Sequence, residues 1–562
     1  MQFSFFVLIL LTLKLYKMFI ITFTCIICAV YCDIPSVQVK EGTLIGSKRE
    51  THNGFPYYEY LQVPYAKPPV GNLRFKSPQP PEPWEGERNA TESNVKNVCL
   101  QLDVSNTTRG SEDCLYLNIF TPITSNKTNK KPVMVSIHAG GFIFGNGIIK
   151  EQNGPDYLIE HDVIVIFINY RLHVFGCFSL GIPEAAGNMG LKDQVMALKW
   201  IHDNIDNFGG DKNNVTIFGI SAGGASVEYH MLSPLSKGLF NKAIIQSGST
   251  LNHWAINYDI ENIGIVLART LGFNESSNDK QRIYEFVLNA NPIDLLEASL
   301  IVTNTATVKG LYFGFVPSIE KDFGNGDTFL CDCPYNLLEA GKFHKVPVMR
   351  GFCEFEGYLI EQGEPGAIGE LSENKNFMDF WNYELKPEDI IKYNTTFNHI
   401  YFNGLKNENK EQGAINFFGD FDIVSGVITS TKLMISHGIK PYVYEFAYDG
   451  NMNLLKIIFN ITREGAAHAD DTAYLLRMFD RSDVNITSSD KLIIARMTKM
   501  WTDFAKIGNP TPDTNNIIPV IWPTYNIYSQ NYLEINEDFK VRSFYEPVRM
   551  AVFESIYSKY HK

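Results

Sequence analysis

A serine between two glycines stands at the centre of the segment Gly219–Gly223, which reads Gly-Ile-Ser-Ala-Gly. The segment follows a short apolar run, Val215–Phe218, and leads into small residues that favour a helix. A sharp strand–turn–helix bend would expose the hydroxyl of Ser221 at a helix N-terminus, where the dipole stabilises developing negative charge. The chemistry that this arrangement serves is nucleophilic attack with a covalent intermediate. The pattern alone is weak, because a glycine-rich structural turn has the same spacing.

Two consecutive glycines follow another apolar run, Val133–Ile137, in the sequence His-Ala-Gly-Gly-Phe. After a strand, such a pair can turn two backbone N–H groups toward one point, where the oxyanion of a tetrahedral intermediate binds. We therefore expect Gly140 and Gly141 to be donors of an oxyanion hole, with the N–H of Ala222 as the third donor. The alternative is a tight structural turn whose N–H groups bind water.

A serine of this kind needs a histidine base, and after a strand–turn–helix nucleophile the chain order is serine, acid, histidine. Four histidines follow every plausible acid, namely His399, His437, His468 and His561. Only His468 lies in a small-residue loop after a predicted strand, so we expect it to be the base. We expect the two aspartates that follow it, at 470 and 471, to serve the first turn of the next helix, where carboxylates oppose the dipole.

The acid should follow the end of an earlier strand, and Val346–Met349 leads to two glutamates, Glu354 and Glu356. The two glutamates are two residues apart, and we expect only one of them to point at the histidine. Gly357 allows the backbone to turn close to the site after Glu356. We therefore predict Glu356 as the acid, and Glu354 remains the alternative.

These residues need a scaffold that brings distant loops to one edge. Short apolar runs typical of buried parallel strands alternate with helical spacing, as in Leu191–Phe208. The runs are Val133–Ile137, Val163–Ile168, Val215–Phe218, Ala243–Gln246, Val346–Met349 and Tyr442–Phe446. This alternation predicts an α/β fold with a large, mostly parallel, doubly wound sheet, whose sites lie at the carboxyl ends of the strands. The stretch Asn252–Asp332 is expected to be a mainly helical insertion.

The N-terminus carries two apolar runs, Phe3–Leu13 and Met18–Cys32, and each is short for a membrane span. We expect residues 1–32 to be a signal peptide, with Met18 as an alternative start, and residues 33–562 to form one domain. The competing interpretation is an uncleaved anchor that spans both runs. Two lysines between the runs disfavour it, because charges near the bilayer centre are costly.

Sequons support export and predict a secreted, extracellular glycoprotein. The glycosylation candidates are Asn89, Asn106, Asn126, Asn274, Asn394, Asn460 and Asn485. Asn214 also begins a sequon, but it enters a predicted buried strand, where a glycan would not fit.

The formal net charge of −13 argues against nucleic acid as a partner, because an acidic surface repels phosphates. After the expected signal peptide, the sequence contains no CxxC pair or HExxH stretch typical of a metal site, and no phosphate-cradling glycine motif after a strand. We therefore expect no metal and no cofactor, and a small-molecule substrate as the partner.

Further segments, taken in order along the chain, extend these motifs over nearly all of residues 33–562. They are Val63–Gly71, Arg74–Phe75, Ser111–Asn118, Asn169–Arg171, Asn188–Gln194, Phe208–Asp211 and Gln246–Ser249. Together they make the chain resemble the type-B carboxylesterase/cholinesterase family, and most of all the insect α-esterases. The resemblance implies the α/β-hydrolase fold, the triad Ser221, Glu356 and His468, the oxyanion hole of Gly140, Gly141 and Ala222, and a disulfide between Cys99 and Cys114.

Four positions depart from the pattern of that family. Ile220 stands where a glutamate commonly precedes the nucleophile, and Ala139 replaces the first glycine of the oxyanion loop. The stretch after Ser249 where the family's second disulfide loop is expected has no cysteines, and no tryptophan lies between Cys99 and Cys114. Cholinesterases use a tryptophan there to hold choline by a cation–π contact, so this chain does not resemble a cholinesterase in specificity.

The sequence thus predicts a serine carboxylic-ester hydrolase that acts through an acyl-enzyme on apolar, uncharged esters. The alternative is a secreted binding, sequestering or adhesion protein of the same fold with little turnover.

Overall fold

The structure is a computed structural model that describes residues 34–91, 97–103, 107–147, 154–276, 278–306, 309–381, 384–404, 409–477 and 484–561. The expected signal peptide, residues 1–32 with Met18 as an alternative start, lies outside these residues. The glycosylation candidate Asn106 lies outside them as well.

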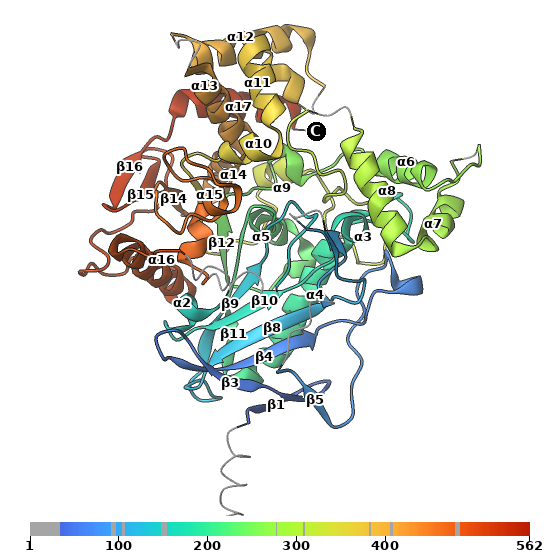
Figure 1. The fold of residues 1–562 in the computed structure, drawn as a ribbon, viewed down its shortest axis with the longest axis vertical. Coiled ribbons are helices and arrows are strands. Elements are labelled where there is room, and N and C mark those ends of the chain that lie inside the picture. The colour runs from blue at the N-terminus through green and yellow to red at the C-terminus, as the bar shows by residue number, and fades with distance from the viewer. Residues whose placement is uncertain are drawn as a thin grey trace, which may run out of the picture.

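An 11-stranded sheet runs through the molecule in the order β16-β15-β14-β13-β12-β11-β9-β10-β8-β4-β3 (Figure 1). From β10 to β15 all neighbours are parallel, whereas β16 at one edge and β8, β4 and β3 at the other pair antiparallel. The strands are β3 (Ser47–Glu50), β4 (Pro56–Pro64), β8 (Tyr116–Pro122), β9 (Lys131–Ile137), β10 (Ile164–Ile168), β11 (Gly210–Ile220), β12 (Lys242–Gln246), β13 (Val348–Cys353), β14 (Tyr442–Phe446), β15 (Asn531–Ile535) and β16 (Lys540–Ser543). The predicted mostly parallel α/β sheet is confirmed.

The predicted strand Val346–Met349 is displaced in the structure. Strand β13 begins at Val348 and continues to Cys353. Pro347 has no N–H to donate to a ladder, so regular pairing starts after it. The glycine and apolar residues that follow then extend the strand to within three residues of Glu356.

Helices cover both faces of the sheet, because successive strand residues point alternately to the two sides. In β9, Val133 and Val135 belong to one core cluster and Met134, between them, belongs to the other. The first face is covered by α4 (Met189–Asn204), α5 (Ala222–Leu232) and α14 (Ser425–Ser436). The second face is covered by α2 (Asp156–Ile159) and α16 (Ser488–Ile507).

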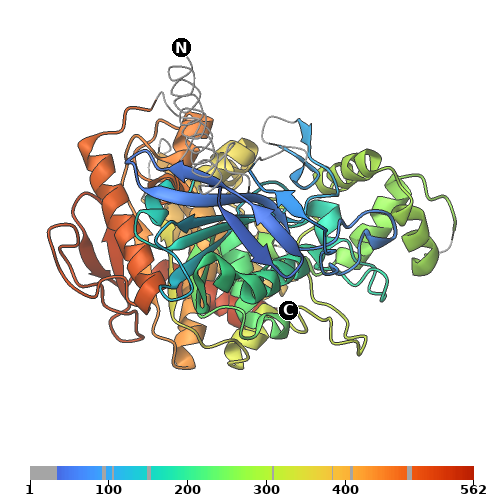
Figure 2. The same cartoon turned by 90° about the horizontal axis from the view of Figure 1, so that it is seen from below.

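The stretch Asn252–Asp332 is helical only in its first part. It contains α6 (Ile260–Thr270), α7 (Lys280–Leu288) and α8 (Pro292–Asn304), which project to one side of the sheet (Figures 1 and 2). Its described residues from 309 onward include no helix or strand before α9 (Pro334–Glu339). Glycines at 310, 314, 324 and 326, all with positive φ, interrupt regular structure in that part.

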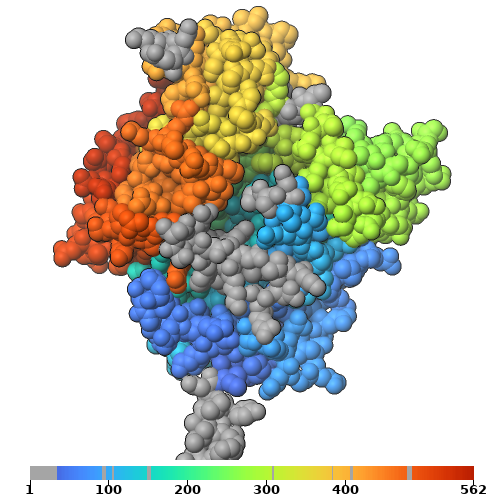
Figure 3. Space-filling model, viewed as in Figure 1, coloured from blue at the N-terminus to red at the C-terminus, as the bar shows by residue number. Residues whose placement is uncertain are grey.

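A helical layer lies beyond the carboxyl ends of the strands, at the top of Figures 1 and 3. It consists of α10 (Tyr358–Gly363), α11 (Pro365–Asn374), α12 (Pro387–Phe402), α13 (Lys410–Gly419) and α17 (Pro547–Tyr560). Aromatic rings hold it together, since Phe417 packs against Phe377, Phe397 and Phe553 at centroid distances of 4.8, 5.4 and 6.2 Å. Two further short helices are α3 (His173–Cys177) and α15 (Leu454–Phe459).

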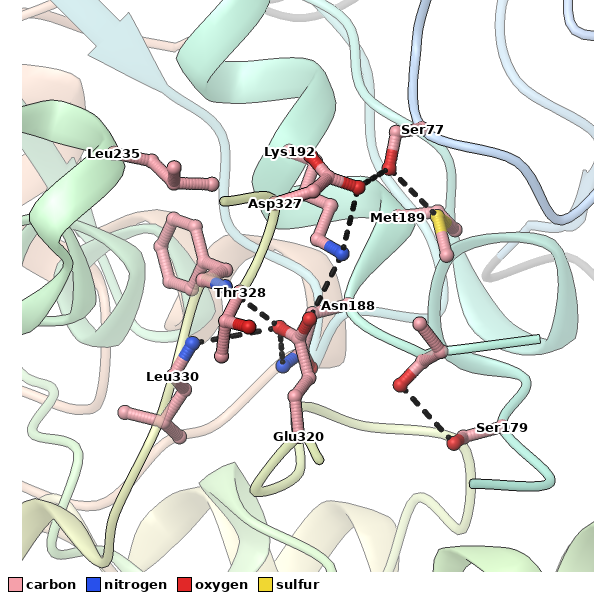
Figure 4. A network of polar contacts seen from close by, with 12 residues as sticks. Ser77, Ser179, Asn188, Met189, Lys192, Leu235, Glu320, Asp327, Thr328 and Leu330 are labelled. Atoms are coloured by element: carbon pink, nitrogen blue, oxygen red, sulfur yellow. Dashed lines mark hydrogen bonds and ion pairs between the residues drawn. The ribbon is translucent and has the colours of Figure 1, made fainter. Parts of the chain in front are cut away.

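A buried polar network joins α4 to the segment that follows the α6–α8 lobe (Figure 4). Lys192 Nζ lies 2.8 Å from Glu320 Oε2, and the two side chains are 3% and 1% exposed. The other carboxylate oxygen accepts from Asn188 Nδ2 at 2.8 Å and from the N–H of Phe329 at 3.1 Å. Both charges of this pair are therefore compensated by named partners.

The N-terminal part carries two small sheets and a disulfide. The sheets are formed by β1 (Ser36–Val39), β2 (Gly42–Ile45) and β5 (Glu87–Asn89), and by β6 (Gln101–Leu102) and β7 (Thr108–Arg109). A disulfide joins Cys99 and Cys114, as the family resemblance implies. The cysteines at 177, 331, 333 and 353 are free thiols. Among the described helices, none combines the length and apolar composition needed to cross a bilayer.

Candidate active site

Ser221 sits at the bend between β11 and α5, with φ 57° and ψ −123°. A positive φ is rare for a residue with a side chain, and such strain concentrates at functional sites. After the bend, helix α5 passes very close to the neighbouring strand β9, and this approach requires a residue without a side chain. A Cβ at Gly223 would lie 2.1 Å from the carbonyl oxygen of Ile137, so only glycine fits there. The predicted strand–turn–helix geometry is thus present.

The loop after β9 turns sharply at two glycines. Gly140 has φ 113° and Gly141 has φ 60°, and a Cβ at Gly140 would lie 2.0 Å from the carbonyl oxygen of Phe144. Since Gly219 of β11 pairs with Ile137 of β9, the loop starts beside the strand that carries Ser221. None of the described residues accepts a hydrogen bond from the N–H of Gly140, Gly141 or Ala222. These three N–H groups are the predicted oxyanion donors.

Glu356 and His468 form a buried pair that joins two distant loops. His468 Nδ1 lies 2.5 Å from Glu356 Oε2, and the side chains are 5% and 0% exposed. The second oxygen of Glu356 accepts the N–H of Cys353 at 2.6 Å, which fixes the carboxylate beside the end of β13. Among the described residues, no hydrogen bond or ion pair joins Glu354 to His468, and Glu354 lines a hollow of the surface. The structure therefore brings together His468 and Glu356, as predicted.

Burial and the neighbouring carboxylates have opposite effects on the pKa of His468. Burial is the largest single influence and would lower the pKa of the imidazole. The charge and hydrogen bond of Glu356, together with the charges of Asp471 and Asp470, outweigh it, so the pKa of His468 lies above its ordinary value. Because Nδ1 is bound to Glu356, the remaining ring nitrogen is Nε2. No described residue forms a hydrogen bond with Nε2, so it is available for proton transfer.

Ser221 and His468 are not hydrogen-bonded to each other in this structure. Ser221 is held by its backbone, since its N–H donates to the carbonyl of Gln246 at 2.9 Å and its carbonyl accepts from Ala225 at 2.9 Å. His468 is held by its bond to Glu356. Such contacts are often long in a free enzyme and tighten when substrate binds.

Asp470 and Asp471 lie in the first turn of the short helix Asp470–Tyr474, as expected, but the hydrogen bonds described for their carboxylates go to other segments. Asp470 accepts N–H groups from Leu455, at the start of α15, at 2.7 Å and from Ala467 at 2.6 Å. The preceding residue, Ala469, has φ 66°, which turns the chain so that Asp470 faces back toward α15. The carboxylate of Asp470 therefore links the loop that carries His468 to the start of α15.

Sequence reasoning missed aromatic side chains beside the oxyanion loop. The ring of Trp254 lies 6.5 Å from Phe142 and 6.1 Å from Phe313, and a Cβ at Gly141 would touch the Phe313 ring at 2.9 Å. These residues come from loops, where no periodicity reveals which side chains meet. The histidine before the tryptophan is also buried, and its Nε2 lies 2.7 Å from Asp422 Oδ1.

The fold and this constellation define the chain as an α/β-hydrolase. A family model described as "Carboxylesterase family" matches residues 33–553. The chain therefore belongs to the carboxylesterase family and is a carboxylic-ester hydrolase.

Characterised relatives cover almost the same length. A juvenile hormone esterase of Tribolium castaneum is 36% identical over 517 residues, which are 87% of this chain and 86% of the relative. Esterase E4 of Myzus persicae is 36% identical over 505 residues, 86% of this chain and 88% of the relative. A crystal structure of juvenile hormone esterase from Manduca sexta, with OTFP covalently attached, superposes with a TM-score of 0.82 and 28% identity, and covers 93% of this chain and 100% of its own.

Proposed function

We propose that Ser221, His468 and Glu356 form a catalytic triad that hydrolyses carboxylic esters through an acyl-enzyme. The observation that carries this proposal is the buried bond between His468 Nδ1 and Glu356 Oε2, with Nε2 left unbonded at the edge of the sheet that also carries the strained Ser221.

In the first half of the reaction, His468 Nε2 takes the proton of Ser221 as Oγ forms a bond to the ester carbonyl carbon. The charge that develops on the carbonyl oxygen is stabilised by the N–H groups of Gly140, Gly141 and Ala222. Glu356 stabilises the imidazolium. The carbon–oxygen bond of the ester then breaks, and His468 returns its proton to the departing alkoxide, which leaves as the alcohol.

In the second half, His468 takes a proton from water, whose oxygen attacks the carbonyl of the acyl-serine. The tetrahedral intermediate uses the same three donors. His468 then returns the proton to Ser221 Oγ as the acid product leaves, which restores the free enzyme.

We further propose that the substrates are apolar, uncharged esters. Ile220, beside the nucleophile, is 8% exposed and contributes no charge, and Trp254, Phe142 and Phe313 place aromatic surface beside the oxyanion loop. These side chains favour a hydrocarbon acyl or alcohol group over a cationic one.

We also propose that residues 1–32 are removed on export and that residues 33–562 form one secreted, glycosylated domain. The side chains of Asn89, Asn126, Asn274, Asn460 and Asn485 are exposed, whereas Asn394 is partly buried and accepts the N–H of Phe377 at 2.7 Å. Asn214 in β11 is tied to the carbonyl of Lys506, which disfavours a glycan. Sequencing the secreted N-terminus should give Asp33, and an N-terminus at Met1 would reject the signal peptide.

Turnover of p-nitrophenyl butyrate by the purified full chain tests the catalytic proposal. We expect rapid steady turnover that disappears in Ser221→Ala and persists in the control Ser436→Ala, on the exposed end of α14. A burst equal to the enzyme concentration followed by negligible turnover would instead indicate a sequestering protein. Turnover retained in Ser221→Ala would reject the assigned nucleophile.

A further inference from the structure

A cavity of about 260 Å³ lies beside the acid–histidine pair, between the ends of β13 and α13, strand β14 and the start of α17. Strand β14 and helices α13 and α17 lie in the upper part of Figure 1. The cavity wall is strongly acidic, and Arg549 is its only cation among the lining residues that the structure describes. The carboxylates are those of Glu354, Glu356, Asp420, Glu445 and Glu546.

Three of these carboxylates have a cationic or hydrogen-bonding partner. Glu356 is bound to His468. Asp420 lies 3.3 Å from Arg549 Nε and accepts a hydrogen bond from Tyr401 at 2.6 Å. Glu546 lies 3.2 Å from the same guanidinium. Arg549 is therefore shared between Asp420 and Glu546, and the cavity wall has no cation for Glu354 and Glu445 among its described residues.

Glu445 and Glu354 have no such partner. Glu445 is only 9% exposed, and no described residue donates a hydrogen bond to its carboxylate or forms an ion pair with it. Glu354 is partly exposed, and no described residue donates a hydrogen bond to its carboxylate or forms an ion pair with it. Glu445 pairs with Phe352 across β14 and β13, and Glu354 lies two residues further on, so both acids are on one face of the sheet.

An ionised carboxylate that is nine-tenths buried and unpaired is unfavourable, so it takes up a proton or is compensated by a ligand of opposite charge. Burial, followed by the charges of Glu354, Glu534 and Glu546, raises the pKa of Glu445 to about 8. Arg542 opposes this shift, but it is bound to Glu534 at 2.7 Å and does not reach Glu445. The empty space in front of Glu445 is thus matched to a positive charge.

We propose that this cavity binds a small organic cation, an alkylguanidinium or alkylammonium, between the carboxylates of Glu445 and Glu354. The charged group would form charge-assisted hydrogen bonds with the two acids, which are stronger than neutral ones. Phe355, Tyr545 and Ile415 line the same cavity and provide apolar surface for the alkyl chain. The acids of the described chain are not clustered closely enough to hold a metal ion, which favours a larger cation.

Such a cation has a consequence for the esterase that rests on the proposed function. Glu356 lines the cavity, so a positive charge there opposes protonation of His468. The pKa of His468 would fall, and the acid side of the activity profile would move to lower pH. Binding should also strengthen as pH rises toward 8, by up to about tenfold per unit, because the cation favours ionised Glu445.

Calorimetric titration of the full chain with n-butylguanidine tests the proposal, on both sides of the pKa of Glu445. We expect saturable binding in the wild type that is tighter at the higher pH. Glu445→Gln and Glu354→Gln should each bind about tenfold or more weakly, as expected when one charge-assisted contact is lost. The control Glu388→Gln, on the exposed face of α12, should bind as the wild type does.

Absence of saturable binding in the wild type, or equal affinity in Glu445→Gln, would overturn the proposal. Thermal unfolding checks the variants, and Glu445→Gln should be at least as stable as the wild type because it replaces a buried acid that has no hydrogen-bonding or cationic partner in the described chain. Calorimetry does not depend on turnover. A chain that binds the probe without hydrolysing esters would reject the proposed function alone, and an active chain that does not bind would reject this site alone.

Discussion

Two buried ion pairs in this molecule are alike in chemistry, but they differ in whether every polar atom of the pair has a hydrogen-bond partner. In the pair of Lys192 and Glu320, the carboxylate oxygens meet the ammonium, a side-chain amide and backbone N–H groups (Figure 4). In the pair of His468 and Glu356, both carboxylate oxygens also have partners, but no described residue forms a hydrogen bond with Nε2 of the imidazole. A fully compensated pair fixes a loop to a helix. A pair with one free nitrogen can also move a proton.

Glu356→Gln should separate the catalytic role of an ion pair from its structural role most clearly. The amide cannot stabilise the imidazolium or hold the required tautomer, so kcat/KM for p-nitrophenyl butyrate should fall by about 10³–10⁴-fold. The melting temperature should change little, because Gln keeps the shape of the side chain. Glu354→Gln is the control and should stay within about tenfold of the wild type. A larger loss in the control than in Glu356→Gln would reassign the acid to Glu354.

Lys192→Met should have the opposite effects, with a loss of stability and no loss of activity in the folded protein. It leaves Glu320 buried without its cation, which typically costs about 3–5 kcal/mol of unfolding free energy. Activity per active site, counted by organophosphate titration, should remain at the wild-type value in the folded fraction. Denaturant unfolding measures the loss, and Lys199→Met, exposed on the same helix, is the matched control. Unchanged stability would show that the network in Figure 4 does not hold the loop.

Gly140→Ala tests the backbone half of the site. The new methyl would meet the carbonyl oxygen of Phe144 at 2.0 Å, so the loop must move and its N–H groups must leave their positions. We expect kcat to fall by about 10²–10³-fold, as when an oxyanion donor is lost. Gly238→Ala, where a Cβ meets nothing within 4 Å, is a control for the strain of positive φ. Wild-type kcat in Gly140→Ala would argue against this loop as the oxyanion hole.

The smallest expected effect is a shift in the pH at which the esterase rate is half-maximal. His468 must be neutral to accept the serine proton, and Glu356 raises its pKa above the ordinary 6.5. Activity should therefore be complete above that raised pKa and fall as pH drops through it. The rate of p-nitrophenyl ester turnover against pH measures the midpoint. A midpoint below that of a free imidazole would mean that burial outweighs Glu356.

Patterns set by a buried sheet could be read from the sequence, whereas loop contacts could not. The apolar run Tyr442–Phe446 became β14 with the same bounds. Strands such as β16, whose four residues are all exposed, carry no apolar signal. The contact of Phe313 with the oxyanion loop depends on the path of an irregular segment, and the unpaired Glu445 depends on which neighbours happen to reach it.

The central claim is that Ser221 is the one hydroxyl made reactive in this chain. Incubation with diethyl p-nitrophenyl phosphate, followed by peptide mapping of the adduct, tests it directly. We predict one phosphoryl group per chain, attached to Ser221, with p-nitrophenolate released in equal amount and ester turnover abolished in parallel. An adduct on another residue, or inactivation without modification of Ser221, would contradict the account.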